Sequence, residues 1–514
     1  MARLTDYTSY RDAQAHFSRQ GLWDLFDGTK ERLNIAHECV DRHVTGGGTA
    51  LRIAHADGAD EIISFAELAA GSARFAHFLT SRNIAPGDRI AVMLEPSLAY
   101  YTALFGAMKA GAVAVPMFTL FGPDGIRLRV DDCQPKLIVT NAEKAGDAQY
   151  EGGPDVIVAD AAFLQSLGGF DDTFEWNTAG GDLAVLQYTS GTTRKLPEAV
   201  RHSHRSIVTL MIAALYGTGI RPGDRFFCPS SPAWGHGLWH GTLAPLALGV
   251  STGTFSGKFD AVRLLKALQD FGITNLSAAA THYRMMRNSG HAQDYTYAFK
   301  KLSFTGEPID SETASFIEAL SGIRVCSMYG TTEVGVILAN YPGAGDLDVR
   351  DGSLGKPVPG VEVEVHGPDG KPLPPGQTGE LVVRRRDGWF PTRDLGRTDA
   401  DGYFYHAGRA DDVIISAGWT MSAVEIEDAI LKHDRVAETA VIGVPDETRG
   451  QVVRAYIVLK GKPESGLEAE IQELVRTSLS RHEYPRQIEF VESLPKTPAG
   501  KVNRKALRDA LPQA

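Results

Sequence analysis

The sequence contains few cysteines, and none of them forms a recognisable metal or disulfide motif. Among 514 residues there are four, with no Cys-x-x-Cys pair: Cys39, Cys133, Cys228 and Cys326. A cysteine zinc site and a disulfide scaffold are therefore not expected. Free thiols favour a reducing compartment, so a cytoplasmic location is expected.

Long hydrophobic runs are also absent, so neither a secretory signal nor a membrane span is expected. Residues 1–6 are polar and lack the apolar core of a signal peptide. The most apolar region, 98–121, is interrupted by Lys109 and Pro116. Such a region indicates a buried helix followed by a strand.

A surplus of positive charge is missing as well. The formal net charge of −11 argues against a general nucleic-acid binder. An anionic ligand would have to be held by local basic groups and backbone N–H donors. At 514 residues the chain is too long for one hydrophobic core, so two or more domains are expected.

Helical and strand patterns alternate in the first 350 residues. Ser64–Glu67 fits a capping box that opens a helix over 64–82. A strand at 90–94, a helix at 99–109 and a strand at 112–115 follow. The same alternation returns as a helix at 261–270 and a strand at 273–276. This alternation predicts an α/β fold with parallel strands and flanking helices.

The pattern changes after about residue 351. Residues 361–365 alternate strictly, and a hairpin-type turn at 368–370 leads to another strand at 379–383. This part is predicted to be antiparallel and barrel-like. The last hundred residues, 413–514, indicate a small α+β domain.

One loop of small and hydroxyl residues indicates a phosphate-binding site. An apolar strand pattern runs into Thr189, Ser190, Gly191, Thr192 and Thr193. Backbone N–H groups and hydroxyls in such a loop can converge on phosphate oxygens. Taken alone, the loop also fits an ordinary Ser/Thr/Gly turn.

Four further short motifs follow in order, and each alone has a plain explanation as a turn, a cap or a surface charge. They are Thr305-Gly306-Glu307-Pro308, Tyr329-Gly330-Thr331-Thr332-Glu333, Thr392-Arg393-Asp394, and a lysine in Pro498-Ala499-Gly500-Lys501. Five motifs in this order over about 310 residues argue against coincidence.

With these motifs, nearly the whole chain resembles the adenylate-forming superfamily. That superfamily includes acyl-CoA synthetases, adenylation domains of peptide synthetases and firefly luciferases. Residues 33–42 look most like the acetyl- and medium-chain acyl-CoA synthetase branch. The resemblance implies a reaction that joins a carboxylate to the α-phosphate of ATP, expels pyrophosphate and passes the acyl group to coenzyme A.

The resemblance also implies roles for individual residues. Lys501 and Thr332 are expected near the α-phosphate, and Glu333 is expected to help ligate Mg²⁺, which prefers hard oxygen ligands. Asp394 is expected to bind the ribose hydroxyls, with Arg409 in support. Gly306, Glu307, Pro308 and Tyr329 are expected to line the adenine slot. The remaining residues expected at ATP or AMP are Thr189, Ser190, Gly191, Thr192, Thr193, Arg194, Gly330 and Thr331.

The domain organisation follows from the same resemblance. An N-terminal domain over 1–408, a hinge over 409–412 with Asp411 at its centre, and a C-terminal lid over 413–514 are expected. The lid would rotate after adenylation, withdraw Lys501 and present Gly418 and Trp419 to coenzyme A. Gly418 would permit a close approach, although a turn glycine is an equal alternative.

The chain departs from the family pattern at two places. Relatives usually continue the phosphate loop with Gly-x-Pro-Lys-Gly-Val, whereas residues 194–200 are Arg-Lys-Leu-Pro-Glu-Ala-Val, one residue longer. Glu198 stands where lysine is usual, so phosphate contacts are expected to shift toward Arg194. Arg393 replaces the glycine common before the ribose aspartate.

The acyl pocket is expected to be apolar and partly aromatic. Its predicted residues are Trp234, Gly235, His236, Gly237, Tyr283 and Met328. No lysine or arginine within these stretches offers a partner for a second carboxylate, although Arg284 directly follows Tyr283. A hydrophobic monocarboxylic acid is therefore expected, whether medium-chain, alicyclic or aromatic. His236 fits either a gate or a packing histidine, with packing slightly favoured.

The combined prediction is an ATP-dependent, AMP-forming acid–CoA ligase that uses ATP, Mg²⁺ and coenzyme A. Two alternatives stay open: a stand-alone adenylating enzyme that loads a carrier protein, and a nucleotide or acyl binder without turnover. A homodimer is left open as the oligomeric state. A dinucleotide-binding dehydrogenase is disfavoured, because no Gly-x-Gly-x-x-Gly opens a helix after a strand.

Overall fold

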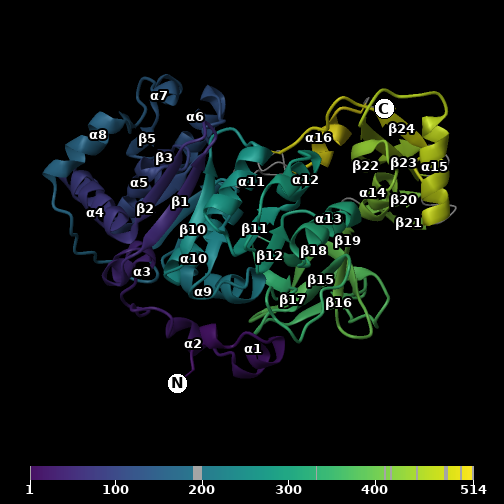
Figure 1. The fold of residues 1–514 in the computed structure, drawn as a ribbon, viewed down its shortest axis with the longest axis horizontal. Coiled ribbons are helices and arrows are strands. Elements are labelled where there is room, and N and C mark those ends of the chain that lie inside the picture. Colours follow the sequence, from purple (N-terminus) through teal and green to yellow (C-terminus); the bar gives the residue numbers. More distant parts are fainter. Residues whose placement is uncertain are drawn as a thin grey trace. The chain divides into compact units, whose positions relative to one another are not determined.

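A computed structural model describes residues 2–188, 199–331, 333–409, 413–416, 419–446, 450–479, 484–497 and 501–511 (Figure 1). The chain divides into two compact units. The first unit comprises Met1–Thr305, Leu320–Cys326 and Tyr341–Leu347, and the second comprises Gly306–Ala319, Ser327–Asn340 and Asp348–Ala514. Each unit is described by itself.

The first unit contains a mostly parallel six-stranded sheet. Its strands, in spatial order, are β6 (Asp155–Val158), β5 (Leu137–Thr140), β3 (Arg89–Met93), β4 (Val113–Pro116), β7 (Leu183–Tyr188) and β8 (Ala199–Ser203). Only β8 is antiparallel to its neighbour within this sheet. Strands β3, β4 and β5 are almost wholly buried, which suits near-continuous apolar runs such as Ile90–Met93.

A second group of strands in the first unit is also mostly parallel. Its order is β12 (Lys301–Thr305), β11 (Asn275–Ala279), β9 (Arg225–Phe227), β10 (Ser251–Ser256), β1 (Thr49–His55) and β2 (Asp60–Ser64). Strand β2 pairs with β1 as an antiparallel hairpin. The other four pairings are parallel, as the helix–strand alternation predicts.

Helices cover the sheets of the first unit. The capping box at Ser64 opens α4 (Phe65–Ser81), and α4 packs on the buried helix α5 (Leu98–Lys109). The other helices of this unit are η1 (Leu4–Asp6), α1 (Tyr10–His16), α2 (Arg19–Trp23), α3 (Ile35–Cys39), η2 (Asp41–Gly46), α6 (Pro123–Cys133), α7 (Ala142–Ala148), α8 (Ala161–Ser166), η3 (Leu167–Gly169), α9 (Ser206–Ile212), η4 (Ala213–Gly217), η5 (His236–Leu243), α10 (Ala244–Ala247), α11 (Ala261–Asp270), α12 (Ala280–Asn288) and η6 (Ala292–Asp294). In η4 and η5 the turns have π-helical geometry.

The first strands of the second unit form an antiparallel sheet. The order is β13 (Cys326–Thr331), β14 (Gly335–Ala339), β15 (Ser353–Pro357), β19 (Phe404–Arg409), β18 (Gly388–Thr398), β17 (Gly379–Arg385) and β16 (Val363–His366). Helix α13 (Ser311–Ser321) precedes it in the chain. Alternate residues of β16 and β17, such as Val363 and Val383, form its buried core. The predicted antiparallel pattern after residue 351 is confirmed.

A smaller sheet occupies the C-terminal part of the second unit. It contains β21 (Trp419–Ser422), β20 (Val413–Ser416), β23 (Gly450–Leu459) and β22 (Val436–Asp446), and β24 (Gln487–Phe490) pairs with β23. Val441 faces a core shared with α14 (Ala423–Leu431) and α15 (Leu467–Ser478). Its neighbours Ala440 and Ile442 face a second core shared with Leu507 of α16 (Arg504–Asp509).

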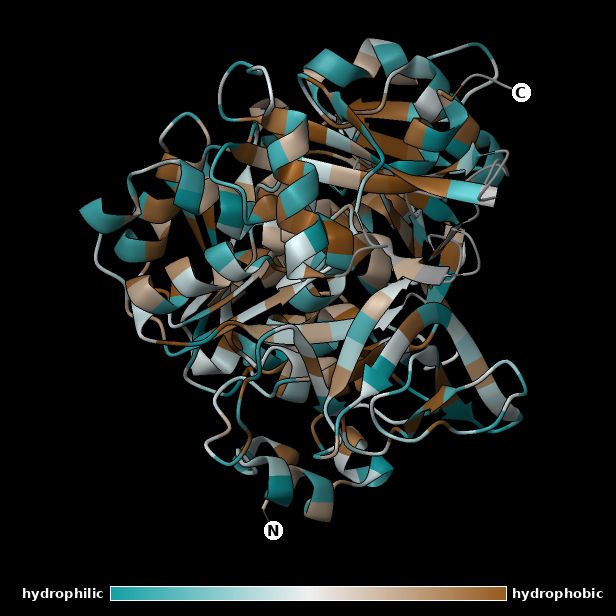
Figure 2. Cartoon of the chain, turned by 90° about the vertical axis from the view of Figure 1, so that its right-hand side faces the viewer, coloured by the Kyte–Doolittle hydropathy of each residue, from teal (hydrophilic) through white to brown (hydrophobic). Residues whose placement is uncertain are grey.

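These two cores show how the strand period positions residues. Side chains of a strand alternate between its two faces, so β22 supplies apolar residues to helices on both sides. Figure 2 shows the same pattern more widely, with hydrophobic residues on the strands and hydrophilic ones on loops and outer helix faces. The expected α+β character of residues 413–514 is confirmed for their described part.

Within the described ranges, no helix is long and apolar enough to cross a bilayer. The apolar region at 98–121 instead forms the buried helix α5 and the strand β4, as its interruptions predict.

Candidate functional site

Two of the predicted nucleotide residues, Tyr329 and Asp394, are joined by a short hydrogen bond. The Tyr329 hydroxyl donates to Asp394 Oδ2 at 2.6 Å. Asp394 is only 5% exposed, and His406 Nε2 lies 3.8 Å from its other oxygen. A buried carboxylate is stable only with such polar partners, so this cluster holds an acceptor group in a defined orientation.

The Tyr329–Asp394 bond shows that the antiparallel sheet curls strongly. Tyr329 lies on β13 and Asp394 on β18, with three strands between them in the hydrogen-bonded order. In a flat sheet four strand spacings amount to about 19 Å, far more than a tyrosine can span. The expected barrel-like curvature of this part therefore brings two distant motifs together.

Thr331 and Glu333 lie at a tight hairpin between β13 and β14. The Thr331 hydroxyl donates to Glu333 Oε2 at 2.6 Å, and Arg385 donates to the backbone oxygen of Glu333. Glu333 is exposed. The hairpin thus presents oxygen atoms at its tip, which is the ligand type that Mg²⁺ prefers.

Gly330 is required by the geometry of this hairpin. A Cβ added at Gly330 would lie 1.9 Å from the backbone oxygen of Gly335 and 2.8 Å from Val336 Cα. The strand pairing shifts register at Tyr329 and Gly330, which is the irregularity of a β-bulge. A residue without a side chain lets the two strands approach at this point.

Arg393 adopts the backbone conformation that the family's glycine at this position would adopt most easily. Its φ is +62°, in the left-handed region that few non-glycine residues occupy. The Arg393 N–H donates to Glu380 Oε1 at 3.0 Å. The bend therefore persists despite the arginine, and Asp394 keeps its place opposite Tyr329.

The predicted adenine-slot residues Gly306, Glu307 and Pro308 follow β12. Gly306 has a φ of +97°, so the chain turns sharply there. Asp310 ends this turn by accepting the N–H of Thr313 at 2.8 Å and the Thr313 hydroxyl at 2.9 Å. The start of α13 is thereby fixed three residues after Pro308.

The predicted acyl residue His236 is buried among hydroxyl groups. Its Nδ1 lies 3.0 Å from Ser230 Oγ and its Nε2 lies 2.9 Å from Ser277 Oγ. The ring also makes an edge contact with Trp234 at 5.4 Å between centroids. Two satisfied ring nitrogens agree with a packing histidine in the wall of the site.

Gly237 and Gly235 keep the backbone beside His236 compact. A Cβ at Gly237 would lie 2.2 Å from the backbone oxygen of Ser231, so a larger residue does not fit. Trp234 and Gly235 remain half-buried, whereas Tyr283 is fully buried. The Tyr283 hydroxyl donates to the Ser303 carbonyl at 3.0 Å. Met328, on β13, is also buried.

Lys501 lies at the end of a short loop in the second unit. Its backbone N–H donates to Thr497 Oγ1 at 3.2 Å, and its carbonyl accepts the Thr497 N–H at 2.7 Å. A bridge between Lys496 and Val502 extends this pairing. The backbone of Lys501 is therefore anchored on both sides, independently of its side chain.

Several predicted residues lie outside the described part of the chain. These are Thr189, Ser190, Gly191, Thr192, Thr193 and Arg194 of the phosphate loop, together with Thr332, Asp411 and Gly418. For Arg409 and Trp419 the strands β19 and β21 are described but the side chains are not. In the part of the chain that the structure describes, no group of three or more His, Cys, Asp or Glu residues is arranged to hold a metal ion.

The ends of the phosphate loop are nevertheless defined. Strands β7 and β8 pair as an antiparallel hairpin, with Tyr188 opposite Ala199. Strand β8 was not among the sequence predictions. The predicted phosphate loop, residues 189–198, thus connects two strands of one hairpin.

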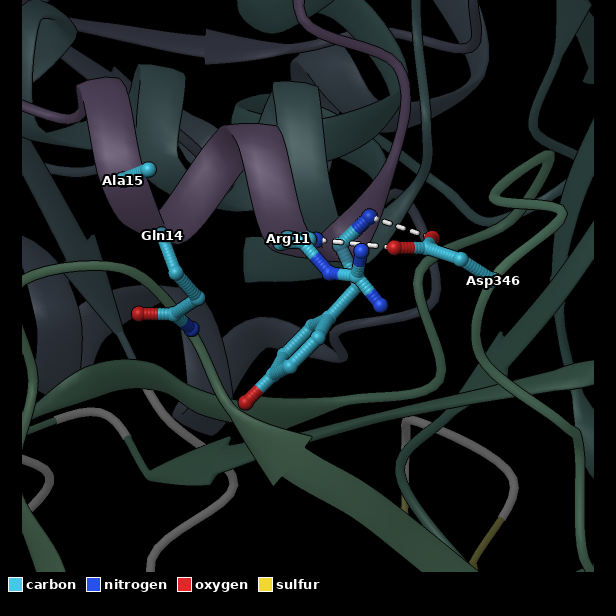
Figure 3. Close-up of a pocket in the computed structure, with 5 residues that line it drawn as sticks. Arg11, Gln14, Ala15 and Asp346 are labelled. Carbon is cyan, nitrogen blue, oxygen red and sulfur yellow. Dashed lines mark hydrogen bonds between the residues drawn. The ribbon is translucent and has the colours of Figure 1, made fainter.

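An open surface cavity of about 580 Å³ lies elsewhere on the first unit (Figure 3). Tyr10, Arg11, Gln14, Ala15 and Asp346 line it. Asp346 accepts the N–H groups of Tyr10 and Arg11 at 2.7 and 2.9 Å, drawn as dashed lines in Figure 3. This carboxylate caps α1, and none of the predicted site residues is among the lining.

Two polar residues near the site were missed by sequence reasoning. His406 approaches Asp394, and Gln187 contacts Trp239 on η5. Gln187 sat in the motif beside the phosphate loop, and a polar residue in an apolar strand was the available signal. His406 had no local signal, because only the curled sheet brings it to Asp394.

The comparisons with known proteins agree with this geometry. Residues 42–389 match the AMP-binding enzyme family, and residues 425–501 match the AMP-binding enzyme C-terminal domain. The acetyl-coenzyme A synthetase of Bacillus subtilis is 29% identical, over 97% of this chain and 94% of that protein.

Solved structures are similar over almost the full length. A Brucella canis acyl-CoA synthetase is 30% identical with a TM-score of 0.76, covering 98% of this chain and 99% of that one. The anthranilate CoA ligase AuaEII, solved with anthranoyl-AMP, is 25% identical with a TM-score of 0.85, covering 96% and 99%.

The chain therefore belongs to the AMP-binding enzyme family. Within it, the chain is an AMP-forming acid–CoA ligase whose reaction uses ATP, Mg²⁺ and coenzyme A. The predicted class of enzyme is confirmed, and so are the fold class and the cofactors.

Proposed function

We propose that this ligase activates a hydrophobic monocarboxylic acid, whether medium-chain, alicyclic or aromatic. The observation that carries this proposal is the composition of the acyl segments. Residues 230–240 and 279–283 contain no lysine or arginine, and their buried members include Trp239 and Tyr283. A second carboxylate would lose its hydration there without gaining a charged partner.

We further propose that the acid and ATP react through the residues named by the sequence. A carboxylate oxygen bonds to the α-phosphorus as the bond to pyrophosphate breaks, and the thiol of coenzyme A then displaces AMP from the acyl carbon. Lys501 neutralises the charge that gathers between carboxylate and α-phosphate. Asp394, oriented by Tyr329, accepts hydrogen bonds from the ribose.

Magnesium fits the described hairpin tip, because Glu333 is exposed there with the Thr331 hydroxyl beside it. Glu333 would help to hold the ion, which neutralises phosphate charge when bound, and Thr332 would lie near the α-phosphate. The phosphate loop, Thr189 to Arg194, would bind the outer phosphates. Gly306, Glu307, Pro308 and Tyr329 would border the adenine.

The domain assignment is also a proposal. The two family matches end at residue 389 and begin at residue 425, which supports a boundary between them. We place the hinge at 409–412 with Asp411, and the lid at 413–514. Gly418 and Trp419 would then face the pantetheine arm of coenzyme A. A cytoplasmic location and a homodimer complete the proposal; subcellular fractionation and light scattering would check them.

Lys501→Ala tests the assignment of the lysine. We expect adenylation, measured by ATP–pyrophosphate exchange, to fall about 100- to 1000-fold, as for the loss of one preorganised contact. Thioester formation from supplied acyl-adenylate should be spared. Lys505→Ala is the matched control, because Lys505 pairs with Asp509 on α16 and such surface pairs contribute little.

The substrate is tested by CoA-dependent AMP release across short, medium-chain, alicyclic, aromatic and dicarboxylic acids. We expect the highest kcat/KM for a hydrophobic monocarboxylic acid. A preference for a dicarboxylic acid would contradict the proposed pocket. Wild-type exchange by the Lys501→Ala enzyme would instead contradict the role of the lysine.

A further inference from the structure

Gln187 is a buried amide in the strand that leads into the phosphate loop. It is 5% exposed on β7, two residues before Thr189. Its neighbours Leu186 and Tyr188 face a hydrophobic core shared with Ile126 and Val130 of α6. Because side chains alternate along a strand, Gln187 points to the opposite face.

On that face, Gln187 forms two hydrogen bonds, to the residues on either side of the predicted acyl residues 234–237. The Trp239 indole N–H donates to Gln187 Oε1 at 3.0 Å, and Gln187 Nε2 donates to the Ala233 carbonyl at 3.5 Å. A Cβ built on Gly235 would lie 3.5 Å from Gln187 Oε1. One side chain therefore bonds both ends of the segment 233–239 and passes close to Gly235 between them.

The other strand of the phosphate hairpin reaches the same tryptophan. His202 of β8 lies with its ring 4.5 Å from the Trp239 ring. Burial lowers the pKa of His202 to about 4, so the ring is neutral at physiological pH and adds no charge beside the loop. Trp239, on the π-helical element η5, thus contacts both strands that bracket residues 189–198.

A buried amide at this position destabilises the fold unless its polar atoms are hydrogen-bonded. An apolar side chain would fill the same space, and an unsatisfied amide destabilises a folded chain. Here both polar atoms are bonded, and both bonds run to the acyl segment. Bonds of fixed length set a distance more strictly than apolar packing does.

We propose that Gln187 is a positioning residue that fixes the acyl segment, 233–239, against the root of the phosphate loop. This inference rests on the proposed sites for acid and ATP. The adenylation step forms a bond between a carboxylate oxygen and the α-phosphorus while the bond to pyrophosphate breaks. Each reactant is held by a different one of these two segments, and Gln187 joins the segments.

Gln187→Met is the direct test, because methionine keeps the length of the side chain and removes both hydrogen bonds. We expect kcat for ATP–pyrophosphate exchange to fall about 10- to 100-fold, since a small misplacement of reacting groups has that effect. KM for ATP and for the acid should change by less than about threefold, because each segment still binds its own reactant. Thioester formation from supplied acyl-adenylate should be unaffected.

Trp239→Phe provides a second variant that removes the N–H donor together with part of the indole ring. We expect it to reproduce part of the loss in kcat. The double variant should be no worse than Gln187→Met, because both changes break the same bond. This non-additivity would distinguish a shared bond from two independent packing defects.

Asn275→Ala is the matched structural control. Asn275 is another fully buried amide on a strand of the first unit, and its side chain donates to the Thr218 carbonyl at 2.9 Å. This variant should lower the unfolding temperature and leave kcat per folded enzyme unchanged.

The proposal is overturned if Gln187→Met keeps the wild-type rate of exchange, or if it slows both half-reactions equally. A loss confined to KM for one substrate would likewise overturn it, by assigning Gln187 to direct binding. If the wild-type enzyme shows no exchange with any hydrophobic acid, the proposed function fails instead, so the two failures are distinguishable.

Discussion

At the scale of single residues, Tyr329 and Asp394 form the best-defined part of the site. Their 2.6 Å hydrogen bond joins positions 65 residues apart. The tyrosine hydroxyl uses one carboxylate oxygen and so sets the direction of the other. A carboxylate oriented in this way can accept bonds from paired hydroxyls, such as those of a ribose.

Asp394→Asn should therefore weaken the binding of ATP specifically. Replacing a charged acceptor by a neutral amide removes about 1.5–3 kcal/mol, the typical value of a hydrogen bond to a charged group. We expect KM for ATP to rise about 10- to 100-fold, with KM for the acid nearly constant. ATP–pyrophosphate exchange at varied ATP concentration measures both.

Tyr329→Phe is the companion variant, because it keeps the aromatic ring and removes the hydroxyl. Its effect on KM for ATP should have the same direction and be smaller. If Asp394→Asn left KM for ATP unchanged while the enzyme stayed folded, the ribose assignment would be wrong.

At the scale of elements, the β13–β14 hairpin positions Thr331 and Glu333. The hairpin depends on Gly330, because its Cα faces the Gly335 carbonyl across the strand pair. The bulge at Tyr329 and Gly330 also directs the tyrosine toward β18. This one β-bulge thus helps to position both the predicted metal ligand, Glu333, and the predicted nucleotide-binding residue Tyr329.

Gly330→Ala should open this hairpin. A methyl group there would overlap the Gly335 carbonyl, and such overpacking costs about 1–3 kcal/mol. We expect a lower unfolding temperature and slower adenylation that extra Mg²⁺ does not restore. Gly168→Ala is the control, because a Cβ at Gly168 meets nothing within 4 Å. Equal thermal stability of the two variants would contradict this account.

Elements with a strong local signal were predictable from the sequence, whereas pairings across the chain were not. The Ser64–Glu67 capping box located α4, and helix 261–270 matches α11 residue for residue. Strand β11 begins two residues later than the predicted strand at 273–276, although the N–H of Thr274 already bonds the carbonyl of Arg225 on the neighbouring strand β9. Strand β8 was missed, since its alternation is short and polar.

For the candidate site, too, local motifs were predictable from the sequence, whereas the contacts between them were not. The motif containing Tyr329 and the motif containing Asp394 were each found by resemblance, but their hydrogen bond depends on how far the sheet curls. Gln187 was overlooked because one polar residue in an apolar strand carries no periodic signal. The contacts that define the roles of these residues are tertiary, and no local sequence pattern predicts them.

At the scale of the whole molecule, buried neutral histidines make stability depend on pH. Burial lowers the pKa of His43, His202, His204, His240 and His282 to about 4. For His204 the geometry explains why: it is fully buried, and its Nδ1 accepts the Ile35 N–H at 3.0 Å. A second ring proton would face that N–H donor.

Stability should therefore fall as the pH drops from about 6.5 toward 4. In this pH range the histidines bind protons in the unfolded chain but not in the folded protein, so acid favours unfolding. For His204 alone, going from pH 7 to pH 5 should cost about 2 kcal/mol. Urea unfolding midpoints at several pH values measure this.

His204→Asn supplies an acceptor for the Ile35 N–H that does not titrate. Its unfolding free energy should vary less between pH 7 and pH 5 than that of the wild type. The same pH dependence in both proteins would show that His204 does not contribute.

The hairpin of β7 and β8 determines how the length of the connecting segment, residues 189–198, can differ between relatives. Because Tyr188 is paired with Ala199, the entry and exit of residues 189–198 are fixed by the sheet and not by the loop itself. Adding one residue between fixed ends changes the closure entropy of a loop only slightly. A relative's loop of the usual length could therefore be grafted between the same two strands without altering their register.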